Sequence, residues 1–431
     1  MSNLKSKKLK TILFNLLLIF MIVLGVVFPI VSIIALILVT LYFLLSNDDK
    51  KIIEICVFLA PFASIFKYNV GTTSFFTIIM LVFVFKMILK YGISKLFILF
   101  YLIFTLFCII GVTNDVTSVI KMLIIPLFIY YLFVNKEKID KDRVFKLFIY
   151  SIIIASFIGY FKDIIPNMNL YLIDKSLRID VGVYTTRFSG LNGDPNYYSI
   201  NVLLAMSLLF YLITRKSINL ILGIINVSIL LFFGAQTNSK SFILVLIGLI
   251  LFALYSLIKN KRYILSLLVV FAVAFSIVMI NNSKITIFDN LINRFSKDTN
   301  IDQLTTGRSE IQKMYIDYIG SNPKVLFFGN GFNSNLLNGH EAHNTYLQMI
   351  YNFGIFGTII FIYLLLFGFK IFKIEKNFVN YLPLIVVLAS YLGLSVLKYF
   401  DFPIHIFIVL LAICGCKRKS KKNDKVRLNE V

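Results

Sequence analysis

The segment from Thr305 to Gly357, TTGRSEIQKMYIDYIGSNPKVLFFGNGFNSNLLNGHEAHNTYLQMIYNFGIFG, is a long polar interruption in an otherwise apolar chain. It carries Arg308 and two of the protein's three histidines, His340 and His343, before it returns to an apolar run. Polar residues gathered between two apolar runs are typical of a loop that connects membrane spans. We therefore expect this loop to hold the functional site.

Outside the loop the chain reads as membrane. Hydrophobic residues make up 59% of its 431 residues, against about 45–50% in soluble proteins. Apolar runs of roughly 17–20 residues recur from end to end, long enough to cross about 30 Å of hydrocarbon as helices. We predict an all-α polytopic membrane protein with about 12–14 transmembrane helices and one large extracytoplasmic loop. The predicted spans are 11–28, 30–46, 51–66, 72–90, 95–111, 117–134, 147–165, 196–213, 218–234, 241–258, 264–281, 344–372, 379–397 and 402–415.

The basic residues set the orientation. The net charge is +22, but lysine and arginine gather in short loops between apolar runs, which indicates membrane topology and not a nucleic-acid partner. Both termini are predicted to be cytoplasmic. Alternation then places segments 47–51, 86–95, 135–146, 214–217, 259–263 and 370–376 in the cytoplasm, and the polar stretches 166–196, 235–240, 282–343 and 398–401 on the outer face.

This scheme divides the chain into four parts. They are an N-terminal transmembrane bundle over 1–165, a central membrane part over 166–281 with the Arg187 and Lys240 outer loops, the large extracytoplasmic loop over 282–343, and C-terminal helices with a basic cytoplasmic tail over 344–431. The polar candidates for chemistry come from three of these parts. They must therefore meet in space if they act together.

Two outer stretches before the large loop contain cations. Arg187 carries a permanent charge and a bidentate fork beside glycines, which fits phosphate recognition, whereas the alternative is a lipid-headgroup anchor. Asp194 followed by Pro195 is typical of a helix start. Lys240 either holds an anion or extends to the membrane interface.

Within the large loop, apolar residues at helical spacing predict a short amphipathic helix that begins near Gly307 or Arg308. These residues are Ile311, Met314, Tyr315 and Tyr318. Glu310 then lies in the first turn, where the helix dipole favours it. Arg308 is unfavourable there unless it pairs with a bound anion or with a local acid such as Glu310.

His343 lies at the entry to the next apolar run. There it could accept a proton from a hydroxyl near neutral pH. His340 is the rival, and the sequence does not choose between them. The histidines and carboxylates lack metal-site spacing, and no nucleotide-binding loop is present, so we expect no metal and no cofactor.

The ordered motifs resemble the O-antigen ligase and polysaccharide polymerase (Wzy-like) superfamily. They are Arg187-Phe-Ser-Gly-Leu with Asp194-Pro-Asn196, Thr237-Asn-Ser-Lys240-Ser, Thr306-Gly-Arg-Ser-Glu310, Asn330-Gly-Phe, and His343-Asn-Thr-Tyr-Leu347 with Gly354 and Gly357. Two positions depart from the family pattern: Lys240 stands where arginine is frequent, and Gln312 stands where tryptophan is frequent.

The resemblance implies a GT-C-like glycosyltransferase that uses an undecaprenyl-diphosphate-linked oligosaccharide without metal or nucleotide. It also implies that Arg308 and His343 are catalytic. Arg187 and Lys240 would bind the diphosphate or glycan, together with Asn196, Asn344 and Glu310. The expected location is the bacterial cytoplasmic membrane, with the active site on the extracytoplasmic side.

The resulting prediction is a polymerase that joins lipid-linked repeat units into a capsular, exo- or O-antigen polysaccharide. A ligase that moves a finished glycan to lipid A core, protein or cell wall shares the same motifs. A flippase for the same lipid is the alternative of another class, although its polar groups should lie inside the spans. Expected partners are the lipid-linked oligosaccharide, membrane lipid, a flippase and a chain-length regulator.

Overall fold

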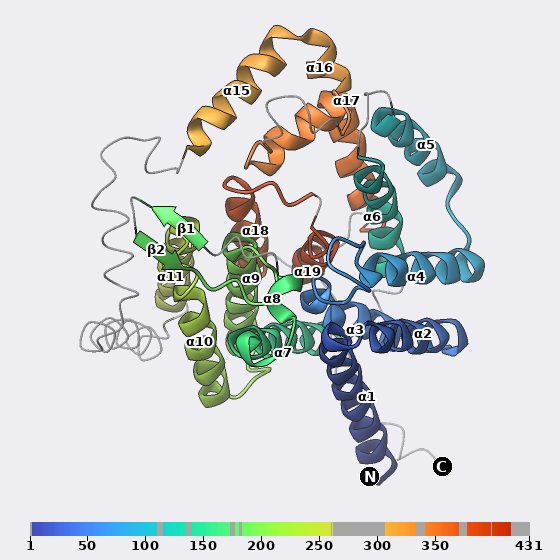
Figure 1. The fold of residues 1–431 in the computed structure, drawn as a ribbon, viewed down its shortest axis with the longest axis vertical. Coiled ribbons are helices and arrows are strands. Elements are labelled where there is room, and N and C mark those ends of the chain that lie inside the picture. Colours follow the sequence, from blue (N-terminus) through green and yellow to red (C-terminus); the bar gives the residue numbers. More distant parts are fainter. Residues whose placement is uncertain are drawn as a thin grey trace, which may run out of the picture.

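The computed structural model describes residues 2–109, 115–134, 139–172, 177–180, 183–259, 261, 307–332, 341–369, 377–397 and 399–414. Within these residues the fold is almost entirely helical (Figure 1). The exception is an antiparallel hairpin of β1 (Leu177–Asp180) and β2 (Val183–Thr186), in which Leu177 pairs with Thr186. The helical class is thus confirmed for the described residues, with this hairpin added to the predicted outer stretch 166–196.

The helices follow the predicted apolar runs closely. In chain order they are α1 (Ser2–Val27), α2 (Pro29–Leu45), α3 (Asp49–Leu59) with the 3-10 turn η1 (Ala60–Phe62), α4 (Phe75–Tyr91), α5 (Lys95–Ile109), α6 (Val116–Val134), α7 (Lys141–Tyr160), η3 (Lys162–Ile164), α8 (Met168–Tyr171), α9 (Pro195–Thr214), α10 (Leu220–Ala235), α11 (Lys240–Lys259), α15 (Arg308–Ser321), α16 (Pro323–Phe328), α17 (Thr345–Phe367), η5 (Phe378–Tyr381), α18 (Leu382–Tyr391) and α19 (Phe402–Ile413).

Five of the described helices are long and apolar enough to cross a membrane. These are α6, α7, α9, α11 and α17, and shorter apolar helices accompany them. Outward-facing side chains on α5, including Leu102 at 58% and Leu106 at 60% exposure, form an apolar stripe that suits contact with lipid. The predicted span 264–281 lies outside the described residues.

Several predicted spans have different boundaries. Helix α1 begins at Ser2 and not at 11, and α17 ends at Phe367 and not at 372. The span predicted at 51–66 is an 11-residue helix followed by η1. Helix α7 begins at Lys141 and not at 147, because the Asp140 side chain caps it by accepting from the Arg143 amide. Helix α18 ends at Tyr391, so the last part of the predicted span 379–397, residues 392–397, is non-helical.

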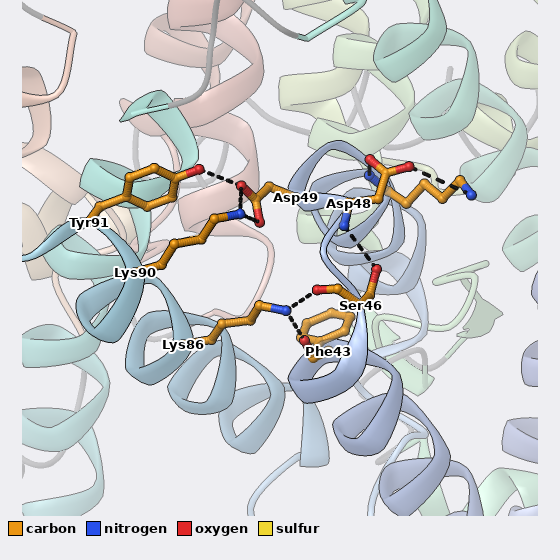
Figure 2. A network of polar contacts seen from close by, with 8 residues as sticks. Phe43, Ser46, Asp48, Asp49, Lys86, Lys90 and Tyr91 are labelled. Carbon is orange, nitrogen blue, oxygen red and sulfur yellow. Dashed lines mark hydrogen bonds and ion pairs between the residues drawn. The ribbon is translucent and has the colours of Figure 1, made fainter.

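Contacts between α2, α3 and α4 join segments that the sequence places in the cytoplasm (Figure 2). Lys86 donates to the carbonyls of Phe43 and Ser46 at the end of α2, where a cation stabilises the helix dipole. Lys90 forms an ion pair of 2.6 Å with Asp49. These three helices are therefore fastened to one another at one end.

Further contacts join segments that are predicted to lie on the same side of the membrane. Arg143 pairs with Glu54 at 2.8 Å, Lys146 donates to the Ser217 carbonyl at 2.6 Å, and Lys141 donates to the Cys414 carbonyl. Segments predicted to be outside also contact one another: the Tyr171 hydroxyl donates to the Tyr68 carbonyl at 3.0 Å, and Asn192 donates to Asp401 at 2.7 Å. Loops predicted to share a side thus meet, as an alternating topology requires.

Helices α15 and α16 lie at the opposite end of the molecule from the start of α1 (Figure 1). With the first part of α17 they form a small apolar cluster around Tyr315, Ile319 and Tyr351, separate from the main core. The predicted helix of the large loop is confirmed, since α15 begins at Arg308. Its buried face differs in one position: Met314 is 39% exposed, and Ile319, at 6%, is buried in its place.

The close approach of α16 to α17 depends on Gly354. This residue has φ 67° inside α17, and a Cβ atom there would lie 2.3 Å from the carbonyl oxygen of Phe327. Directly after α16, the Asn330 amide donates to the Tyr351 carbonyl of α17 at 2.7 Å, and this backbone hydrogen bond requires the same kink. The Asn330-Gly-Phe and Gly354 motifs are therefore two sides of one contact.

We predict that Gly354→Ala lowers the thermal unfolding temperature of the detergent-solubilised protein by several degrees. An L-residue in this conformation, with φ 67° and ψ −180°, costs about 1–3 kcal/mol, and the clash with backbone adds to that cost. Gly248→Ala is the matched control, because no atom lies within 4 Å of its Cβ position in α11. Equal unfolding temperatures for the two variants would contradict the packing described.

Candidate functional site

The segment 392–401, between α18 and α19, gathers the outer loops. Three consecutive carbonyl groups accept hydrogen bonds from three different parts of the chain. Arg308 Nη1 donates to Gly393 at 2.8 Å, Thr345 Oγ1 to Leu394 at 2.5 Å, and the Tyr197 hydroxyl to Ser395 at 2.5 Å. The sequence prediction treated most of this segment as a span and so missed its role.

Arg308 is the first residue of α15, after Gly307 in the left-handed conformation. Its side chain is half-buried, and the bond to Gly393 directs it toward the segment 392–401. Glu310 lies in the first turn, as predicted, and is exposed. The helix therefore presents a fixed cation at its N-terminal end, where its amide groups also favour an anion.

Arg187 is 5% exposed and is held from two sides. Its Nε donates to the Thr237 carbonyl at 2.8 Å, and its Nη2 donates to Asn196 Oδ1 at 3.0 Å. The same Asn196 oxygen accepts from Ser239 Oγ at 2.9 Å. A guanidinium this deeply buried does not lie among lipid headgroups, so the structure disfavours the anchor alternative.

The Arg187 cluster and Arg308 approach each other at Gly393. Ser239 Oγ and Ser241 Oγ are 2.9 Å apart. A Cβ atom at Gly393 would lie 3.8 Å from Ser241 Cβ and 3.9 Å from Arg308 Nη1. The two predicted arginines thus belong to adjoining clusters that meet at Gly393. Lys240, the first residue of α11, is half-buried beside these serines.

His343 directly precedes the N-cap of α17. It has φ 47°, and its carbonyl accepts from Gln312 Nε2 at 3.5 Å. Gln312 is the residue that departs from the pattern of the similar family, which frequently has tryptophan there. The Nδ1 atom of His343 is shielded from solvent. Asn344 uses its side-chain oxygen to cap α17, accepting from the amides of Tyr346 and Leu347. The rival His340 lies outside the described residues.

The sequence analysis did not identify the aromatic and acidic side chains around these residues. Tyr197 and Tyr399 stack with ring centroids 3.4 Å apart. Burial raises the pKa of Tyr399, and the carboxylates of Asp194, Glu341 and Asp401 raise it further. Glu341 lies two residues before His343 and is a second candidate base. The pairs Tyr197-Tyr198 and Tyr399-Phe400 beside polar residues were the available sequence signal.

Asp401 is a buried acid beneath this region. Its Oδ2 accepts from Asn192 Nδ2 and Asn201 Nδ2, each at 2.7 Å, and Asn201 Oδ1 lies 2.7 Å from His405 Nε2. Burial raises the pKa of Asp401 to about 6 despite these two hydrogen bonds. This network fixes the 192–194 loop, α9 and α19 relative to one another.

The described residues contain no group of three or more histidine, cysteine, aspartate or glutamate side chains that could hold a metal ion. This absence does not test metal independence, which stays a prediction. The arrangement instead offers two arginines, a histidine and two acids at the outer ends of helices. Such a set can neutralise a phosphate group and accept a proton.

Comparison with known protein families locates a match in the same region. The model described as O-antigen ligase (Wzy_C) matches residues 224–362. This segment is therefore similar to the O-antigen ligase family, as the motifs indicated. No curated protein and no solved structure matches the chain. The match contains Lys240, Arg308, Glu310, His343 and Asn344, whereas Arg187 and Asn196 precede it.

O-antigen ligase family members are glycosyl-transferring enzymes that act on lipid-linked glycans and membrane lipids, so the match supports an enzyme of this general type. Together with the apolar helices it indicates a multi-pass membrane protein. The family description does not separate polymerase from ligase. The roles of individual residues stay predictions.

Asp401 should make stability depend on pH. Its pKa is raised in the folded state, so the folded protein binds the proton more tightly. The resulting stabilisation is present below the unfolded value of 3.8 and is lost as the pH rises through about 6. The full effect is on the order of 2 kcal/mol.

We predict that Asp401→Asn flattens the stability profile between pH 4 and 7, measured by thermal unfolding in detergent. Asp317→Asn, which removes an exposed carboxylate from α15, is the control. If Asp401→Asn retains the wild-type pH dependence, another group causes it.

Proposed function

We propose that the protein is a glycosyltransferase that acts on the outer face of the cytoplasmic membrane. It joins undecaprenyl-diphosphate-linked oligosaccharide repeat units into a surface polysaccharide. The observation that carries the proposal is the junction of the Arg187 and Arg308 clusters at Gly393. The start of α17, after His343, is bound to the same segment through Thr345. These features combine in a chain whose residues 224–362 match the O-antigen ligase family.

In the proposed reaction the two arginines bind the donor diphosphate. A hydroxyl oxygen of the acceptor sugar attacks the anomeric carbon of the donor while the bond from that carbon to the diphosphate oxygen breaks. Undecaprenyl diphosphate leaves with the bonding electron pair, and His343 accepts the hydroxyl proton. Attack opposite the leaving group inverts the anomeric configuration.

The arginines would contribute mainly through fixed charge. Arg308 is held by the Gly393 carbonyl and Arg187 by Thr237 and Asn196, so little reorganisation is needed as charge develops on the leaving diphosphate. Because the diphosphate is already a good leaving group, positioning and charge neutralisation supply most of the required catalysis. Lys240, Asn196, Asn344 and Glu310 are proposed to bind the diphosphate or glycan around this centre.

The second candidate function is ligation of a finished glycan to lipid A core, protein or cell wall. The family match is compatible with it and does not separate it from polymerisation. Both reactions share the donor and the chemistry and differ only in the acceptor. In the polymerase proposal, a flippase supplies the lipid-linked repeat units and a chain-length regulator acts on the product.

We expect Arg308→Ala and Arg187→Ala each to reduce glycan formation by about 100-fold or more, the scale of losing one charge-stabilising donor. His343→Ala should reduce it by about 100- to 10,000-fold through loss of the base. The measurement is complementation of a gene deletion, with surface glycan separated on a gel and protein levels verified. Lys313→Ala, which removes an exposed cation from α15, is the matched control.

The gel also separates the two functions. Loss of a polymerase leaves single repeat units attached to the acceptor, whereas loss of a ligase leaves long chains on the lipid carrier. Normal glycan from all three variants at normal protein levels would refute the site assignment.

The orientation has its own test in a variant whose four native cysteines are replaced by serine. We expect a membrane-impermeant maleimide to label Glu310→Cys in intact cells and Lys216→Cys only after permeabilisation, since both positions are exposed in the structure. The reverse pattern would place the large loop in the cytoplasm and exclude an outer-face reaction.

A further inference from the structure

A cavity of about 250 Å³ lies among segments predicted to face outward, on the other side of Tyr399 from the stacked Tyr197. Its wall includes Lys67, Tyr171, Asn192, Asp194 and Tyr399. Every residue that lines it falls outside 224–362, the part of the chain that matches the O-antigen ligase family. The lining contains neither arginine and none of Thr237, Asn196 and Gly393, so the cavity is separate from the arginine clusters, although it shares an aromatic wall with their surroundings.

The cavity combines aromatic and hydrogen-bonding side chains. Tyr171, Tyr399 and Phe400 contribute ring surface, while an ammonium, a carboxylate and an amide come from Lys67, Asp194 and Asn192. Hydroxyl groups of a sugar need donors and acceptors, and the apolar C–H face of its ring packs on aromatic surface. A purely apolar tail would remove water from these polar groups without offering them hydrogen bonds, at a cost in binding.

The polar side chains of the wall are held in place. Lys67 Nζ lies 5.5 Å from the centre of the Tyr171 ring and donates to the Tyr171 carbonyl at 3.5 Å. Asn192 is fixed by its bond to Asp401, and Asp194 by accepting from the Asn196 amide at 2.8 Å. Rigid partners lower the entropy cost of binding, which is expected of a ligand site.

The position of the cavity connects it to the proposed chemistry. Asp194 lines the cavity, and Asn196, two residues further, holds Arg187. Tyr399 lines the cavity and stacks on Tyr197, whose hydroxyl bonds to Ser395 in the segment that also binds Arg308. A ligand here would lie beside the diphosphate site without occupying it.

We propose that this cavity is a saccharide subsite that holds one sugar ring of the acceptor glycan. The proposal rests on the glycan-transfer function above and extends it by naming where the acceptor binds. A cavity of this size is just below the usual range of about 300–1,000 Å³ for ligand pockets, which suits a single ring better than a whole repeat unit. The Asp194 carboxylate disfavours a diphosphate in the same place.

Because the lining residues lie outside the family-matched segment, the choice of acceptor sugar is assigned to a different part of the chain from Arg308 and His343. Residues near 67, 171 and 192–194 would then determine which sugar is extended. The arginines and the histidine would serve the bond exchange whatever the sugar.

The test measures binding of two probes to the purified full-length protein. The first is the free oligosaccharide repeat unit released by mild acid from the host's own lipid-linked precursor, and the second is inorganic pyrophosphate. We expect Lys67→Gln and Tyr171→Ala each to weaken oligosaccharide binding at least about tenfold, the scale of one charge-assisted hydrogen bond or one aromatic contact, with pyrophosphate binding unchanged. Lys67→Arg should recover part of the affinity.

Lys162→Gln is the control, because this lysine lies in η3, shortly before the outward-predicted stretch 166–196, and does not line the cavity. Thermal unfolding of each variant separates lost binding from lost folding. Wild-type oligosaccharide affinity in both folded cavity variants would overturn the proposal. It would also be overturned if Lys67→Gln weakened pyrophosphate binding alone, because the cavity would then be an anion site.

Complementation in cells separates this proposal from the proposed function. If Arg308→Ala and Arg187→Ala abolish the glycan while both cavity variants produce it at wild-type amount and length, only the saccharide subsite is refuted. If the arginine variants produce normal glycan, the glycan-transfer function fails, and the subsite proposal fails with it.

Discussion

The backbone carbonyls of Gly393, Leu394 and Ser395 are the feature on which the arrangement of the candidate site depends. Carbonyl groups in a non-helical segment have no helical partners, and where such a segment is buried in a membrane protein they require other donors. Here the donors come from Arg308, Thr345 and Tyr197. The end of α18 thereby fixes the start of α15, the start of α17 and the first turn of α9.

This arrangement explains how a long loop can place a charged group accurately. Helix α15 belongs to a small apolar cluster with α16 and α17 and not to the main core. The kink at Gly354 lets α16 lie against α17. The hydrogen bond from Arg308 to Gly393 then connects the N-terminal end of α15 to the helix bundle. Two separate constraints therefore position Arg308.

Much of the fold follows from apolar run length and local caps. The limits of α6, α9 and α19 agree with the predicted spans within a few residues, because hydrocarbon thickness and residues such as Asp194 leave little freedom. The predicted site requires Arg187 to lie near the loop that carries Arg308; in the structure Arg187 binds Thr237, and the two arginine clusters adjoin at Gly393. The role of Arg187 in binding a substrate is a separate question from its position.

Other features depend on contacts that the local sequence does not contain. The segment after Tyr391 is apolar enough to continue as a helix, and its departure from helical structure reflects partners from far along the chain. Met314 has the right spacing for burial, but the direction of α17 selects Ile319 instead. The residues that line the proposed saccharide cavity come from four segments, 63–74, 171, 192–194 and 399–400, so no linear motif predicts it.

The single oxygen of Asn196 that binds both Arg187 and Ser239 has an evolutionary consequence. An acceptor shared by two donors cannot be exchanged without disturbing both, and a change at either donor alters what the acceptor must supply. Positions 187, 196 and 239 are thereby coupled and should vary together or not at all among relatives. Drift at this junction is restricted to coordinated steps, while the lipid-facing stripe of α5 can exchange one apolar residue for another independently.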